Sequence, residues 1–246
     1  MADNEQGNDL LAGLDAFLAE HEAELIEFRR DLHAHPELAF NEHRTTQRVA
    51  LRLAAAGLRP VILPKGTGML VDIGSEQVPY TDRPVVALRA DMDALPMADD
   101  KDVPYRSTVP DVCHACGHDV HTTVLLGAGL FLAEQAAAGQ LPGRVRLVFQ
   151  PAEEAAGGAL DVLAAGGMAS VGRIFALHCD PRLDAGQLGV HVQIAAELDQ
   201  LGFVFRQEHI QIREQIIVLL ISGHAHHPRA CRICLRRTRS RERLPR

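Results

Sequence analysis

Residues 145–167 read VRLVFQPAEEAAGGALDVLAAGG and combine a short apolar run, an acidic turn and a helical segment. The run at 145–150 is rich in apolar and β-branched residues and leads straight into polar residues, which is typical of a buried strand in an open sheet. The segment at 158–167 has helical spacing and closes on two glycines. This stretch therefore predicts a strand followed by a helix.

The same alternation continues on both sides of this stretch. VVALRA (85–90) and IFALH (174–178) are further short apolar runs that predict buried strands, and HTTVLLGAGLFLAEQ (121–135) predicts a helix. Two segments with apolar residues at helical spacing precede them, at 9–30 and 45–56. Strands and helices in alternation predict an α/β fold, with a mainly parallel central sheet flanked by helices.

Length, charge and hydropathy restrict the class of protein. A chain of 246 residues, 47% of them hydrophobic, is long enough for one large domain or for one domain and part of another. The net charge of -7 combines an acidic body with an arginine-rich end at 222–246, and an acidic body argues against nucleic acid as the main partner. No apolar run reaches the roughly 18 residues that cross a bilayer, and the amino end lacks a signal-peptide pattern. We therefore expect a cytoplasmic protein with no membrane partner.

Polar side chains follow three of the predicted strands. The strand at 85–90 leads into Asp91 and Asp93, the strand at 145–150 leads into the acidic pair at 153–154, and the third ends at His178. Because the carboxyl ends of parallel strands meet at one edge of a sheet, ligands collect there. We expect these side chains to lie close together.

The loop HACGHDVH at 114–121 adds thiol and imidazole groups to this set. Thiolate, imidazole and carboxylate are the ligands that zinc, manganese or a similar divalent ion prefers. Gly117, between Cys116 and His118, allows a tight turn that lets both side chains face one centre. The sequence therefore predicts a metal site.

Each of these residues also has a purely structural interpretation. Asp91 and Asp93 fit helix caps or turn residues, and the pair at 153–154 fits a solvated surface. His178 fits a hydrogen-bonded core histidine, and Cys113 fits a small buried residue. The occurrence of all of them at successive strand or loop ends favours a site.

Five motifs in this order resemble the M20 metallopeptidase superfamily. The similarity is to the amidohydrolase branch that includes hippurate hydrolases, N-acyl-amino-acid aminoacylases and hydrolases of indole-acetyl-amino acids. The motifs are RRDLHAHPELAFNEHRTT (29–46), LRADMDALPM (88–97), HACGHDVHTTVLLGAG (114–129), VRLVFQPAEEAAGGA (145–159) and ALHCDPRLDAGQLGV (176–190).

The resemblance implies a role for each matching residue. Glu153 is expected to be the general base, and Asp93 to orient a metal-bound histidine. Asp91 stands where other branches have a metal-binding histidine, and a structural role is expected for it. His224 matches a histidine that binds the substrate carbonyl across a dimer. The expected metal ligands are Cys116, His118, Glu154 and His178.

The activity implied by the resemblance is hydrolysis of the amide bond of small N-acyl amino acids, such as hippurate, with two divalent metal ions such as zinc or manganese. The fold implied is a zinc-exopeptidase-like catalytic domain with a lid domain. A homodimer is expected for the full-length family, but a chain with only part of a lid is less able to form one.

The carboxyl-terminal part departs from the family pattern. We expect residues 1–190 to be the amino-terminal part of the catalytic domain, 191–228 a partial lid and 229–246 a basic, disordered tail, in a truncated or frameshifted chain. A functional basic arm, or a zinc site built on the CRIC sequence at 231–234, is the alternative for the tail. A remnant that binds metal without hydrolysing a substrate is the alternative for the whole chain.

Overall fold

The computed structural model describes residues 2–74, 85–141 and 143–181. The chain divides into two compact units, Met1–Leu177 and His178–Arg246. All the described helices and strands belong to the first unit, and the predicted lid fragment, the basic tail and the boundaries near 190 and 228 lie outside the described residues. The elements are α1 (Ala2–Ala34), α2 (His43–Ala55), β1 (Val61–Ile62), β2 (Met69–Ile73), β3 (Val85–Asp91), α3 (His118–Ala137), β4 (Val145–Gln150), α4 (Gly158–Ala164) and β5 (Val171–Ala176).

The strands form one sheet in the order β1-β2-β4-β3-β5. The pairings of β3 with β4 and with β5 are parallel, whereas β1 with β2 and β2 with β4 are antiparallel. The predicted α/β fold with helices around a central sheet is confirmed, and the sheet is mixed where a mainly parallel one was predicted. A short connection between β1 and β2 forms a hairpin, which only antiparallel strands can do.

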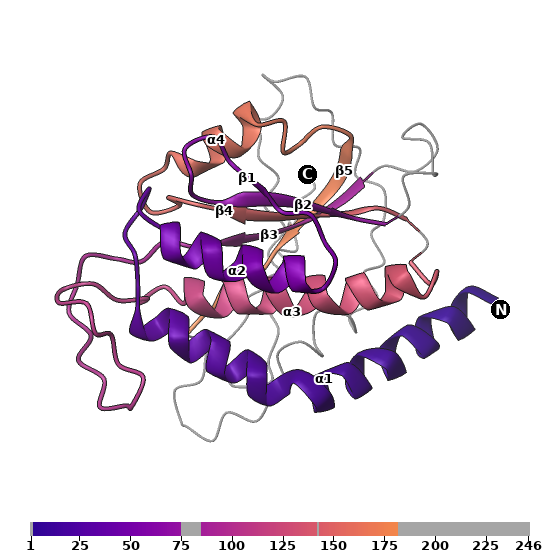
Figure 1. The fold of residues 1–246 in the computed structure, drawn as a ribbon, viewed down its shortest axis with the longest axis horizontal. Coiled ribbons are helices and arrows are strands. Elements are labelled where there is room, and N and C mark those ends of the chain that lie inside the picture. The colour runs from indigo at the N-terminus through magenta and orange to yellow at the C-terminus, as the bar shows by residue number, and fades with distance from the viewer. Residues whose placement is uncertain (1, 75–84, 142, 182–246) are drawn as a thin grey trace, which may run out of the picture. The chain divides into compact units, whose positions relative to one another are not determined.

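Helices cover both faces of the sheet (Figure 1). The helices α1, α2 and α3 lie together on one face and α4 lies on the other. Contact between α3 and β4 is close at Gly129, where an added Cβ would lie 2.5 Å from Cδ1 of Leu147. Leu126 of α3 and Leu147 of β4 are fully buried, so the interface between this helix and this strand is part of the core.

The observed elements differ from the predicted ones mainly at their ends. The helix predicted at 9–30 extends from Ala2 to Ala34. It ends there because the next residue, His35, precedes Pro36, and a residue before proline disfavours the helical conformation. The strand predicted at 174–178 occupies Val171–Ala176, so His178 follows it instead of ending it. Within the described part of the chain, no helix has both the length and the apolar character that crossing a bilayer requires.

The connections around β3 create the edge at which the predicted site residues collect. Helix α3 connects β3 to β4, which is its neighbour on one side in the sheet. Helix α4 then connects β4 to β5, which is the neighbour of β3 on the opposite side. The register pairs Asp91, the last residue of β3, with Gln150, the last residue of β4. The polar residues after both strands therefore begin at the same level, where the strand order changes direction.

Candidate metal centre

The loop that carries Cys116 and His118 turns at Gly117. Gly117 has φ 84° and caps the amino end of α3, so His118 is the first residue of the helix. A side chain at this position would be strained in the left-handed conformation, which is the reason for glycine here. The turn places the Cys116 thiol and the His118 ring in one group, as the sequence predicted.

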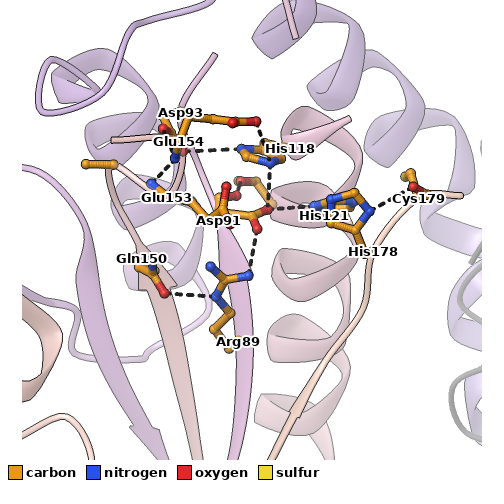
Figure 2. A network of polar contacts seen from close by, with 12 residues as sticks. Arg89, Asp91, Asp93, His118, His121, Gln150, Glu153, Glu154, His178 and Cys179 are labelled. Carbon is orange, nitrogen blue, oxygen red and sulfur yellow. Dashed lines mark hydrogen bonds and ion pairs between the residues drawn. The ribbon is translucent and has the colours of Figure 1, made fainter. Parts of the chain in front are cut away.

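Within the first compact unit, two overlapping sets of side chains have the composition of a metal site. The ligand atoms of Cys116, His118 and Glu154 all lie within 4.8 Å of one another, and so do those of Asp91, His118 and Glu153. Figure 2 shows Asp91, His118 and the two glutamates converging from β3, α3 and the turn after β4. His118 belongs to both sets, so it lies at the centre of the group.

Asp93 fixes the orientation of the His118 ring. Its Oδ1 lies 3.2 Å from Nδ1 of His118, and both side chains are buried. Because a carboxylate only accepts hydrogen bonds, the proton is on Nδ1, and Nε2 faces Glu154 and Asp91 at 3.8 and 3.7 Å. This is the arrangement in which a carboxylate sets the tautomer of a metal-binding histidine.

The same carboxylate also holds the turn that carries the acidic pair. The backbone N–H of Glu153 donates to Oδ1 of Asp93 at 3.1 Å, and that of Glu154 donates to Oδ2 at 3.0 Å. Both glutamates keep contact with solvent, and the Glu154 side chain is 28% exposed. The backbone of the turn is therefore fixed by a buried carboxylate, while both glutamate side chains stay partly accessible to solvent.

Asp91 is buried in a second set of hydrogen bonds that sequence reasoning missed. His121 donates from Nδ1 to Oδ1 of Asp91 at 2.6 Å, and Arg89 donates to Oδ2 at 2.6 Å while its Nε donates to Gln150 (Figure 2). Burial raises the pKa of Asp91, but His121 and Arg89 outweigh burial, and the pKa stays below its usual range. Asp91 is therefore a fixed negative charge beside His118.

The electrostatics of the group fit a bound cation. Burial, together with the nearby carboxylates of Glu154, Glu153 and Asp91, raises the pKa of the Cys116 thiol to about 12. A thiol and three acidic groups this close repel one another as anions, and a divalent cation among them removes the repulsion. The donor set of sulfur, nitrogen and oxygen suits zinc or manganese.

A separate buried network lies on the other side of the loop and was also missed. His33 of α1 donates to Oδ2 of Asp119 at 2.7 Å, and Nε of Arg29 forms an ion pair with the same oxygen at 2.8 Å. The other ring nitrogen of His33 lies 3.2 Å from Asp99, which also binds Lys101. Burial raises the pKa of Asp99, but its hydrogen bonds with Lys101 outweigh burial, so the pKa lies below its usual range. The network joins α1 to the first turn of α3.

The remaining predicted residues have separate outcomes. Cys113 is a buried free thiol and fits its structural interpretation. His178 is the first residue of the second compact unit, and its Nδ1 lies 2.8 Å from the Cys179 carbonyl oxygen. His224 lies outside the described residues. The metal-binding role of His178 and the substrate-binding role of His224 stay predictions.

Known proteins are similar to this chain over its amino-terminal part. A Rhodococcus jostii (strain RHA1) protein named as a glutamate–cysteine ligase 2-3 is 54% identical over 168 residues, which are 68% of this chain and 20% of that protein. The N-acetylcysteine deacetylase of Bacillus subtilis (strain 168) is 40% identical over 184 residues, which are 74% of this chain and 47% of the deacetylase. The chain thus spans less than half the length of these curated relatives.

A solved structure supports the same relationship. The crystal structure of the YXEP protein of Bacillus subtilis, described as a dinuclear metal binding peptidase from the M20 family, superposes with a TM-score of 0.64 at 40% identity. The superposition covers 70% of this chain and 47% of YXEP. The sequence pattern of peptidase family M20/M25/M40 matches residues 87–233. The chain therefore belongs to peptidase family M20/M25/M40.

Proposed function

We propose that this chain takes part in the metal-dependent hydrolysis of the amide bond of small N-acyl amino acids. The observation that carries the proposal is the group of Cys116, His118 and Glu154, whose ligand atoms lie within 4.8 Å of one another, with Glu153 next to it. The name of the related deacetylase describes an N-acyl amino acid as substrate, which supports this substrate class.

The proposed roles follow from the geometry and from the family. Cys116, His118 and Glu154 are proposed as metal ligands, with His178 as a further ligand. Asp93 is proposed to orient His118, since it accepts the Nδ1 proton while Nε2 faces Asp91 and Glu154. The dinuclear relative supports a pair of divalent ions, and zinc and manganese both suit the donor set.

Glu153 is proposed as the general base. When bound, the metal lowers the pKa of a water and polarises the scissile carbonyl. The Glu153 carboxylate takes a proton from the attacking water and then gives it to the leaving nitrogen, so that the C–N bond breaks to a carboxylate and an amine. Its backbone is anchored to Asp93 at 3.1 Å, which keeps the carboxylate at the edge of the group.

The proposal is tested with Glu153→Gln in the 246-residue chain. We expect this variant to bind metal like the wild type, because Glu153 is not a proposed ligand, and to lose at least about 100-fold in kcat on an N-acetyl amino acid. Glu154→Gln is the matched control, since the neighbouring substitution should reduce metal content first. Metal contents measured by mass spectrometry distinguish the two variants.

Two results count against the proposal. If Glu153→Gln loses metal and Glu154→Gln retains it, the roles of the two glutamates are reversed. If the wild-type chain binds metal but hydrolyses no acyl amino acid, it is a metal-binding remnant and not an enzyme. A homodimer, which we propose for the full-length family members, is tested separately by light scattering.

A further inference from the structure

The turn after β4 is held by a second buried carboxylate, from Glu42. Its Oε1 accepts the backbone N–H of Ala152 at 2.7 Å, and the glutamate is fully buried. The next two N–H groups, of Glu153 and Glu154, are accepted by Asp93. Three successive backbone donors are thus fixed by two side chains from elsewhere in the chain.

Steric contacts show how closely the segment before α2 packs against this turn. An added Cβ on Gly157 would lie 2.6 Å from Cζ of the Phe40 ring, so the ring fills the space beside the turn. Ala152 has φ 48°, a conformation that a non-glycine residue rarely adopts. Such strain persists only where surrounding contacts enforce it, and the hydrogen bond from Ala152 to Glu42 is one of them.

A buried carboxylate is costly unless it is well hydrogen-bonded. Burial raises the pKa of Glu42, the amide of Ala152 opposes that rise, and the nearby Asp93 adds to it. By contrast, Glu37, five residues earlier, accepts the backbone N–H groups of Arg44 and Thr45 at 2.9 and 2.7 Å and so caps α2. The two glutamates of one segment therefore have different partners, a helix end and the turn.

We infer that Glu42 is a positioning residue that holds Glu153 and Glu154 in place through the backbone of Ala152. Its carboxylate is 110 residues away in sequence from the amide that it binds. The proposal rests on the function proposed above only for the roles of the two glutamates, and the hydrogen bond itself is independent of that function.

Two substitutions separate reach from charge. Glu42→Asp keeps the charge but withdraws the carboxylate by one methylene, so it no longer reaches the amide. Glu42→Gln loses the charge but keeps an oxygen within reach. Since a buried amide that loses its acceptor opens more easily, we expect the amides of 152–154 to exchange with deuterium at least about tenfold faster in Glu42→Asp. Glu42→Gln should stay within about threefold of the wild type.

Cobalt(II) titration gives a second readout that needs no turnover. Glu42→Asp should weaken cobalt binding about tenfold, because Glu154 is displaced, and Glu42→Gln should restore it. Where the wild type is active, Glu42→Asp should lower kcat with little change in KM. Glu37→Asp is the matched control, the same substitution in the same segment, and it should leave exchange at 152–154 and cobalt affinity unchanged.

Three results overturn the inference about Glu42. The first is that the amides of 152–154 exchange with deuterium in Glu42→Asp at the wild-type rate. The second is that Glu37→Asp accelerates this exchange as much as Glu42→Asp does, which would indicate general destabilisation. The third is a larger effect of Glu42→Gln than of Glu42→Asp, which would show that charge and not reach matters. A wild-type chain without hydrolytic activity refutes the proposed function, and exchange and cobalt binding then still decide the role of Glu42.

Discussion

Replacing Asp93 with asparagine should weaken metal binding by a predictable amount. Oδ1 of Asp93 accepts from His118 and Glu153, at 3.2 and 3.1 Å, and Oδ2 accepts from Glu154 at 3.0 Å. Asparagine keeps the first two bonds when its oxygen occupies the Oδ1 position, but its NH₂ group then faces the N–H of Glu154. An unsatisfied buried donor costs about 1–3 kcal/mol.

This cost should appear as weaker binding, because the unpaired amide belongs to Glu154, a proposed ligand. A change of about 1–3 kcal/mol corresponds to about 5- to 150-fold in dissociation constant. Cobalt(II) titration of Asp93→Asn against the wild type at neutral pH measures it. Asp99→Asn, which removes a buried carboxylate from the separate His33 network, is the control and should bind cobalt normally. Equal affinity in Asp93→Asn and the wild type would refute the orienting role of Asp93.

Two further predictions concern stability. In Gly158→Ala the new Cβ would lie 1.5 Å from the Pro151 carbonyl oxygen, so we expect the free energy of unfolding in urea to fall by about 3 kcal/mol or more. Gly143→Ala is the control, because its Cβ would have nothing within 4 Å, and it should change the free energy of unfolding by less than about 0.5 kcal/mol. Similar losses in both variants would contradict this reasoning. The pKa of Asp99 is lower in the folded than in the unfolded chain, because its hydrogen bonds with Lys101 outweigh the effect of burial. The ionised carboxylate therefore stabilises the fold above about pH 4, and this contribution is lost as the pH falls. Between neutral and acidic pH, the free energy of unfolding should fall less steeply in Asp99→Asn than in the wild type. Parallel curves for the two proteins would argue against a stabilising role of ionised Asp99.

The central strands and helices could be predicted because their sequence patterns are local. The strand at 145–150 coincides with β4, and the strand at 85–90 differs from β3 by one residue. The hairpin β1-β2 was missed, since β1 has only two residues, both exposed, and the pattern sought was strand alternating with helix. The run at 69–73 reads MLVDI, a short, mainly apolar run, and this is the sequence signal that could have revealed β2.

The candidate site divides in the same way. The gathering of Cys116, His118 and the acidic pair in one group could be predicted from their residue types and from their places on a loop and after a strand. The contacts of Glu42 and His121 could not, since nothing in the sequence indicates which distant group each of these side chains binds. Their partners lie 110 and 30 residues away in sequence and become visible only when the chain is folded.

The bond between Glu42 and Ala152 also has a consequence for how the chain folds. It closes a loop of 110 residues, so we expect it to form after the strands β3 and β4 have paired and α2 has docked. Contacts this distant in sequence are among the slowest to form. The acidic turn should therefore reach its final conformation late in folding, and a metal supplied to the unfolded chain would meet the cysteine and histidine of the loop before it meets both glutamates in place.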